Sequence, residues 1–182
     1  MSKIDRLLKA FVTHISVPWR DLIAPAQRVI FCVYDETEEL RLKAKFGEFE
    51  IETKKLDYGW IQVDLTDSFA TWMDTQKYAT KYFENPELLG TILPKFVSHI
   101  EVVFADELSR RGANDNTVVA LTGVGSLFGF VKVKDVVDRL APKVTGRLVV
   151  FFPGSYENNN YRLLDGYDGW NYHAVPITCE KD

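Results

Sequence analysis

The hydrophobic positions near the amino terminus recur at steps of three and four residues. Six apolar residues follow this spacing, namely Ile4, Leu7, Leu8, Phe11, Val12 and Ile15. Such spacing places apolar side chains on one face of a helix, and Ser2 followed by Asp5 is typical of a helix start. The pattern therefore predicts an amphipathic helix that packs against a core.

Five short segments predict β-strands. Residues 28–34 (RVIFCVY) form a continuous run of β-branched and aromatic side chains, typical of a strand that is buried on both faces. Pro176 in the last segment indicates an edge strand, and Pro153-Gly154 are expected to stop the strand before them. The other four segments are 59–65 (GWIQVDL), 117–121 (TVVAL), 147–152 (RLVVFF) and 172–177 (YHAVPI).

Helical patterns separate these strands. Asp35 has the position of an N-cap for a helix that ends near Lys55, and a further helix is expected over residues 134–140. Residues 67–112 are also helical in pattern, with Gly112 as the expected C-cap. The clearest apolar stripe there consists of Phe96, Val97, Ile100, Val103, Phe104 and Leu108. The polar stretch 155–169 is expected to run over the surface.

Strands that alternate with helices, and that are apolar almost throughout, favour one fold class. This class is an α/β fold with a doubly wound, mainly parallel sheet of about five strands and helices on both faces. Residues 1–182 contain no repeat or linker, so we expect a single domain. Ligands of such sheets bind beyond the carboxyl ends of the strands, which predicts that Asp35, Gly123, Ser126 and Gly154 lie at one rim.

Composition supports a folded, acidic protein. The 182 residues are 46% hydrophobic and 13% aromatic, which is enough apolar surface for one sizeable core. The formal net charge of -4 gives no basic patch of the kind that attracts a phosphate backbone. Direct binding to nucleic acid is therefore not expected.

The cysteines and the amino terminus indicate a cytoplasmic protein. Cys32 and Cys179 are far apart and have no CxxC partner, which suits a reducing compartment. Charged residues such as Lys3 and Arg6 interrupt the first apolar positions, so no signal-peptide core is present. No stretch reaches the roughly 18 apolar residues of a membrane span, and we expect no membrane association.

The most distinctive short motif is TGVGS, which follows the third predicted strand. Gly123 and Gly125, between Thr122 and Ser126, would let backbone N–H groups approach a phosphate. A Walker A loop would need a lysine after its second glycine, and Phe128 stands where a dinucleotide loop has its third glycine. Two interpretations stay open: a phosphate-binding loop, or a tight turn that seats the next helix.

No catalytic constellation is visible in the sequence. The glycines around Ser126 do not form GxSxG, and the three histidines, His14, His99 and His173, fall on separate predicted elements. Their spacing matches no zinc pattern. We therefore expect no catalytic residue, no metal and no cofactor.

A second distinctive segment, FFPGSYENNNYRLL, occupies residues 151–164. Tyr156, Tyr161 and Arg162 belong to the residue types that dominate interface hot spots, and Gly154 and Asn160 lie beside them. The alternative is a surface loop that its own aromatic side chains attach to the sheet. Both interpretations stay open, because burial cannot be read from sequence.

Residues 118–177 resemble the carboxyl-terminal half of the BrxB family of BREX bacteriophage-defence systems. The resemblance is carried by TGVGS, by the FPG-Y motif that starts at Phe152, and by Arg162-Leu163. Before residue 118 it is looser, through the opening helix and the strand that ends at Tyr34-Asp35. It implies a role beside a methyltransferase, a large ATPase and the alkaline-phosphatase-like protein PglZ.

The resemblance implies a non-catalytic adaptor that binds PglZ and other BREX proteins and reaches DNA only through the complex. The alternative is a nucleotide-binding or hydrolytic regulator that uses the glycine loop after the third strand. The residues we predict to bind a partner or ligand are Asp35, Thr122, Gly123, Gly125, Ser126, Gly154, Tyr156, Asn160, Tyr161 and Arg162.

Overall fold

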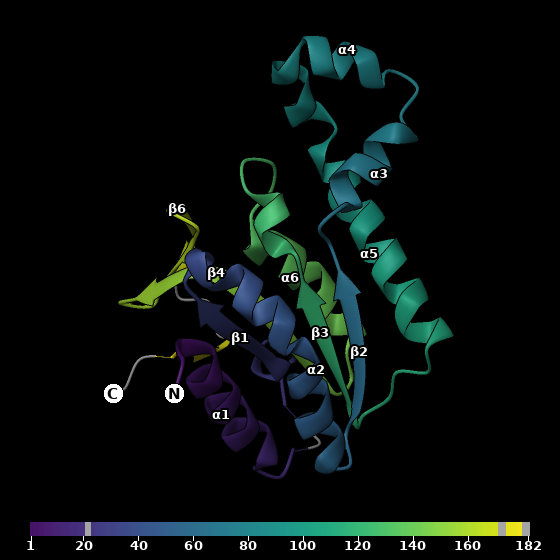
Figure 1. Ribbon diagram of the computed structural model, residues 1–182. Coiled ribbons are helices and arrows are strands. Elements are labelled where there is room, and N and C mark those ends of the chain that lie inside the picture. The colour runs from purple at the N-terminus through teal and green to yellow at the C-terminus, as the bar shows by residue number, and fades with distance from the viewer. Residues whose placement is uncertain (21–22, 171–173, 180–182) are drawn as a thin grey trace.

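The computed structural model describes residues 1–20, 23–170 and 174–179, and its centre is a parallel β-sheet (Figure 1). The strand order is β2-β3-β4-β1-β7, and every pairing along this path is parallel. The bounds are β1 Val29–Tyr34, β2 Gly59–Asp64, β3 Thr117–Thr122, β4 Arg147–Glu157 and β7 Val175–Ile177. The predicted α/β class with its mainly parallel sheet is confirmed.

Two helices cover one face of the sheet. They are α1 (Lys3–Ser16) and α2 (Glu39–Lys55), which lie in front of the strands in Figure 1. Ser2 and Asp5 form a capping box at the start of α1, as the sequence indicates. Phe49 of α2 packs edge-on against Phe151 of β4 and at a tilted angle against Phe11 of α1, which joins the two helices and the sheet in one apolar cluster.

The other face is covered by α5 (Leu93–Arg110) and α6 (Val133–Leu140). All six residues of β1 and all six of β3 are buried, because helices lie on both sides of these central strands. The stripe predicted on α5 is correct except for Val103, which is 45% exposed. Gly112 has a φ of 71° just beyond α5, as expected for a residue that ends a helix.

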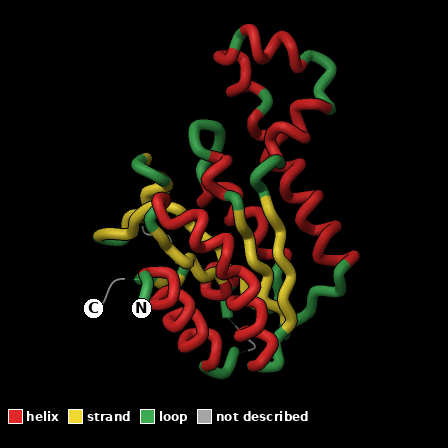
Figure 2. Tube along the Cα trace, in the orientation of Figure 1, coloured by secondary structure: helices red, strands yellow, loops and turns green. Residues whose placement is uncertain are grey.

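A helical segment extends away from both layers. It comprises α3 (Ser68–Asp74), α4 (Ala79–Glu84) and a 3-10 helix (Pro86–Thr91), and it lies at the top of Figure 2. Neither α4 nor the 3-10 helix contains a buried residue. Asp67 has the N-cap position of α3, but its side chain makes no capping hydrogen bond.

The prediction that β4 stops at Pro153-Gly154 is also wrong. β4 continues to Glu157 and pairs there with β5 (Asn160–Leu163), which pairs in turn with β6 (Gly166–Trp170). The stretch 155–169 is therefore mainly antiparallel sheet rather than an irregular surface loop. We call residues 154–170 the arm.

Two local features explain the continuation. Asn158 and Asn159 both have positive φ, the conformation of a two-residue hairpin turn, and asparagine tolerates it well. A Cβ on Gly154 would lie 1.8 Å from the carbonyl oxygen of Arg162, so only glycine lets β5 approach β4 at this position. Pro153 does not break the strand; it stays in register with Tyr34 of β1.

The last strand, β7, begins at Val175, and residues 172–173 of the predicted strand lie outside the described residues. Within the described ranges β7 pairs with β1 alone, in agreement with the edge position that Pro176 indicates. Among the described residues, no helix has both the length and the apolar character needed to cross a membrane.

Candidate functional site

The carboxyl ends of the strands form a rim with a crevice of about 240 Å³. The loop after β1 leads to α2 on one face, the loop after β3 leads towards α6 on the other, and β4 lies between them. Open α/β sheets bind ligands at such divergence points. The rim crevice is lined by Glu36, Glu39, Lys43, Thr66, Gly123, Gly125, Ser126, Pro153 and Leu164.

The glycine loop lies in very close contact with the loop that follows β2. Gly123 has a φ of 74°, and a Cβ there would lie 2.4 Å from Asp64 Oδ1 and 2.4 Å from Thr66 Oγ1. Asp64 Oδ1 in turn accepts hydrogen bonds from the backbone N and the hydroxyl of Thr66. Gly123 is therefore required by packing, whatever the crevice binds.

The hydroxyl of Ser126 is already engaged with backbone carbonyl groups. Its oxygen lies 2.9 Å from the carbonyl oxygen of Leu65 and 2.7 Å from that of Gly123. The N–H of Ser126 also donates to Gly123 O, at 3.1 Å. These contacts favour the tight-turn interpretation of TGVGS, because the groups that would meet a phosphate hold the loop together.

Two carboxylates weaken the case for a phosphate in the rim crevice. Glu36 and Glu39 line it, and Lys43 pairs with Glu39 at 3.5 Å. The Tyr34 hydroxyl donates to the same Glu39 carboxylate. A phosphate would therefore meet more negative than positive charge at this position.

Thr122 is buried and does not line the rim crevice. Its side chain is 3% exposed, and its hydroxyl has no hydrogen-bond partner among the described residues. Of the predicted residues on the glycine loop, Gly123, Gly125 and Ser126 thus share a crevice and Thr122 lies behind them.

Asp35 and Gly154 lie in a second hollow, of about 510 Å³, at the base of the arm. Asp35 Oδ1 accepts from the backbone N and the hydroxyl of Thr37, and these two hydrogen bonds lower the pKa of Asp35. This is the capping role that the sequence indicates. The arm-base hollow is lined by Lys3, Arg6, Val33, Tyr34, Asp35, Gly154, Ser155, Tyr156, Glu157, Thr178 and Cys179.

The predicted residues of the arm divide into an anchor and an exposed set. Tyr161 is 1% exposed, packs edge-on against Phe31 and donates its hydroxyl to Ala174 O at 3.2 Å. Burial raises the pKa of Tyr161. Arg162 is exposed, and Tyr156 and Asn160 are partly exposed. Tyr161 therefore attaches the arm to the sheet, Arg162 lies on the opposite face, and the interface interpretation of the exposed residues stays a prediction.

Asp168 is a structural residue that sequence reasoning missed. It lies on β6, is 3% exposed, and accepts hydrogen bonds from the backbone N–H groups of Val133 and Lys134 at the start of α6. Burial raises the pKa of Asp168. No local sequence pattern indicates this role, because the two N–H donors lie 35 and 34 residues before Asp168 in the chain.

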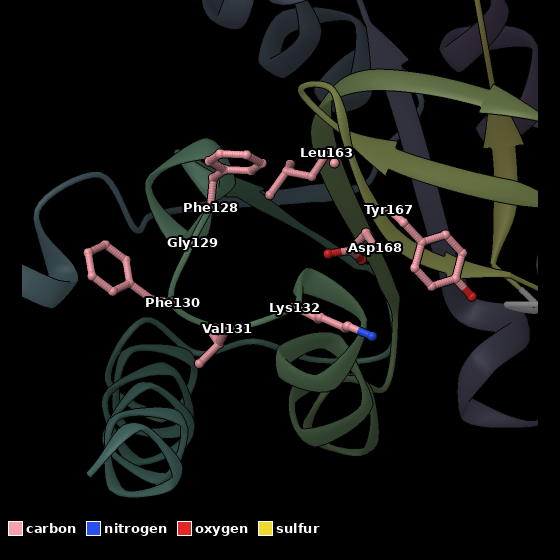
Figure 3. A pocket seen from close by; sticks show the side chains of 9 residues that line it. Phe128, Gly129, Phe130, Val131, Lys132, Leu163, Tyr167 and Asp168 are labelled. Carbon is pink, nitrogen blue, oxygen red and sulfur yellow. The ribbon is translucent and has the colours of Figure 1, made fainter. Parts of the chain in front are cut away.

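A third hollow, of about 190 Å³, lies between the arm and the loop that precedes α6. Figure 3 shows Phe128 and Tyr167 on opposite sides of it, with Asp168 between them. Phe128 is 44% exposed and Tyr167 50% exposed. The ammonium group of Lys132 lies 5.3 Å from the centroid of the Tyr167 ring. This arm hollow is thus lined by large aromatic side chains that keep about half of their surface exposed.

Titratable groups do not gather into a metal site in the part of the chain that the structure describes. His14 lies on α1 and His99 on α5, on opposite faces of the sheet, and His173 lies outside the described residues. Cys32 is buried, which raises the pKa of its thiol.

These features define a class of protein: a doubly wound, parallel α/β protein whose central strand extends into an antiparallel arm beside the rim. The family model described as BREX protein BrxB matches residues 61–177. Because the match covers more than half of the chain, the chain belongs to the BrxB family, whose members are components of BREX defence systems. No curated protein and no solved structure matches it.

Proposed function

We propose that this protein is a non-catalytic adaptor of a cytoplasmic BREX complex and that it binds the alkaline-phosphatase-like partner PglZ. Membership of the BrxB family supports the assignment to a BREX system, and the arm supports a role in binding another protein. An arm that Tyr161 fixes to the sheet can present neighbouring side chains without a large loss of conformational entropy on binding.

The observation that carries this proposal is the group of exposed aromatic side chains along the arm and the arm hollow. Tyr167 and Phe128 are about half exposed, and Tyr156 and Arg162 project from the same sheet. Tyrosine, tryptophan and arginine dominate interface hot spots, because they combine a large contact area with polar groups. The arm is therefore the surface that we assign to the partner.

Co-purification of the tagged full-length protein with PglZ from the same operon tests the adaptor role. A stable complex at micromolar concentration is the expected result. If both proteins are folded and do not associate at that concentration, the assignment of PglZ as partner is wrong.

A double variant tests the assigned surface. Tyr156→Ala with Arg162→Ala removes one side chain from each face of the arm and should weaken association by at least tenfold, while circular dichroism stays unchanged. A matched control is Tyr78→Ala with Arg41→Ala, which removes an exposed tyrosine and an exposed arginine that do not belong to the arm. Equal losses of affinity in both variants would exclude the arm as the specific contact.

The alternative, a nucleotide-binding or hydrolytic regulator, is supported by the position of the rim crevice at the divergence point of the sheet. The carboxylates of Glu36 and Glu39 and the engaged Ser126 hydroxyl argue against it. A thermal-shift screen with nucleotides and divalent metals decides, because a ligand at 100 times its Kd stabilises the folded state by about 2.7 kcal/mol. Turnover of a substrate by the isolated chain would favour this alternative over the adaptor.

A further inference from the structure

A hollow of about 360 Å³ lies at the amino-terminal edge of the sheet, opposite the rim, and contains a buried arginine. Arg147 is the first residue of β4, and it is 9% exposed. Much of the remaining wall is apolar. The polar and aromatic part of the lining consists of His14, Trp19, Arg20, Gln27 and Arg147, and the apolar wall includes Ile15, Val17, Ile23, Ile30 and Val175.

Stacked rings hold the guanidinium group of Arg147 in one orientation. Its central carbon lies 4.6 Å from the centroid of the Trp19 ring, and Trp19 stacks on Tyr58 at 3.9 Å with an interplanar angle of 4°. Trp19 Nε1 donates to the carbonyl oxygen of Ile15, which fixes the indole. A guanidinium group that rests its face on an aromatic ring keeps its edge free to donate hydrogen bonds.

Most hydrogen-bond donors of Arg147 remain unused. Nη1 donates to the carbonyl oxygen of Gly146 at 3.0 Å, and this is the one hydrogen bond of its side chain within the described residues. A guanidinium group carries five N–H donors in a planar fork that matches a carboxylate. Donors therefore remain available on the side chain that lines the hollow.

The positive charge is not balanced by a described carboxylate. No ion pair within the described ranges includes Arg147, Arg28 or Arg20. Burial and the charge of Arg28 lower the pKa of Arg147, and burial and the charge of Arg147 lower the pKa of His14. Within the described part of the chain this buried cation has positive charge nearby and no anionic partner, which is costly, so a bound anion would stabilise the site.

We propose that this hollow binds a carboxylate carried on an apolar group, with the Arg147 guanidinium as its charged partner. The carboxylate would accept two hydrogen bonds from the edge of the guanidinium group, and the apolar part of the ligand would contact Ile23 and Val175. A carboxylate fits better than a phosphate, because much of the wall is apolar and cannot hydrogen-bond to three phosphate oxygens. A free small acid and the carboxyl terminus of a peptide share this chemistry.

Titration of the full-length protein with matched probes tests the proposal. N-acetyl-leucine should bind saturably, whereas N-acetyl-leucinamide, which lacks the carboxylate, should bind at least tenfold more weakly. The readout is tryptophan fluorescence, and the signal change should vanish in Trp19→Phe. A hexapeptide that ends in leucine, with a free or an amidated terminus, then distinguishes the two sources: binding of the free-terminus peptide alone indicates a chain terminus.

Variants of the cationic side chains complete the test. Arg147→Lys keeps a positive charge but loses the planar fork of N–H donors. Its affinity for N-acetyl-leucine, measured by isothermal titration calorimetry, should fall at least tenfold. Arg20→Gln changes an exposed side chain at the hollow, so this variant should fold as the wild type does. It should bind N-acetyl-leucine about two- to threefold more weakly, because one positive charge that attracts the carboxylate is lost. Arg41→Gln, whose side chain is 70% exposed on α2, is the matched control and should bind as the wild type does.

Three outcomes would overturn the proposal. They are failure of a folded wild-type protein to bind any carboxylate probe, equal binding of acid and amide, and binding of inorganic phosphate in preference to N-acetyl-leucine. Association with PglZ through the arm is independent of all these results.

Discussion

At the scale of single residues, several side chains of the predicted site have structural roles. Asp35 caps the turn after β1, Ser126 ties its loop to Leu65, and Tyr161 anchors the arm. Arg162 lies on the opposite, exposed face of the arm, whereas Tyr156 pairs with Tyr161 across the hairpin and packs against its ring at 4.7 Å. Residue type alone therefore does not separate a binding tyrosine from an anchoring one.

Replacement of Gly123 by alanine should destabilise the protein strongly. The positive φ costs an alanine about 1–3 kcal/mol, and the new Cβ would also overlap Asp64 Oδ1 and Thr66 Oγ1, each 2.4 Å away. Gly129→Ala is the matched control, since Gly129 has a φ of 82° but nothing within 4 Å of its Cβ position. Urea unfolding should give the larger loss for Gly123→Ala. Equal losses of unfolding free energy in the two variants would show that the close approach of Gly123 to Asp64 and Thr66 does not add to the cost of the substitution.

Acid should remove a contribution that Asp5 makes to stability. Hydrogen bonds from Ser2, and then Lys45, lower the pKa of Asp5 from 3.8 to about 2. The unfolded chain therefore takes up a proton at higher pH than the folded chain, so this stabilisation is complete above pH 4 and is lost between pH 4 and 2. The Tm difference between wild type and Asp5→Asn should shrink over that interval. A difference that stays constant down to pH 2 would contradict the assignment.

At the scale of secondary-structure elements, the arm changes the protein most. β4 begins as a parallel central strand and ends as an antiparallel one, and Pro153-Gly154 mark the change. Two contacts attach the arm: Tyr161 fixes it to the sheet, and Asp168 joins it to the first turn of α6. The arm is therefore coupled to the helix layer as well as to its own strand.

Removal of the Asp168 carboxylate should loosen this coupling. Asp168→Ala leaves the N–H groups of Val133 and Lys134 without their acceptor, and an unsatisfied buried donor costs about 1–3 kcal/mol. The unfolding midpoint in urea should fall accordingly. Asp165→Ala, which removes an exposed carboxylate from the turn between β5 and β6, should leave the midpoint nearly unchanged. A similar fall in both variants would argue against a specific cap.

At the scale of the whole molecule, the layers differ in how well they are packed. The sheet is covered on both faces, whereas α4 and the 3-10 helix after it bury no residue and lie beyond the layers (Figure 2). Tyr78 and Phe83 of this segment are 56% and 64% exposed. The segment therefore has little tertiary packing to keep it folded.

Hydrogen exchange should report this difference directly. Backbone amides of residues 79–91 should exchange through local opening, far faster than those of β3, whose amides are expected to open only with global unfolding. Exchange measured by mass spectrometry on peptides from both regions checks this. Equal protection of the two regions would mean that the segment is stabilised by contacts that the isolated chain does not show.

The sequence determined the local structure and the class of fold. The 3.6-residue apolar spacing of α1 and α5 and the continuous apolar runs of β1 and β3 follow from which faces each element must bury. Ser2 with Asp5, Asp35 and Gly112 mark ends that depend on neighbours in sequence. The asparagine pair 158–159 carried the same kind of signal for a hairpin turn, although the polar character of the segment indicated a loop.

Only the tertiary structure decided how distant segments meet. The contact of Gly123 with Thr66, the cap that Asp168 gives to α6, and the hollow around Arg147 and Trp19 each join residues that lie tens of positions apart. Spacing along the chain carries no information about such contacts, because they depend on strand order and on the crossing of loops. Local pattern therefore fixed the main helices and the parallel strands, whereas packing fixed the arm and decided which side chains stay exposed.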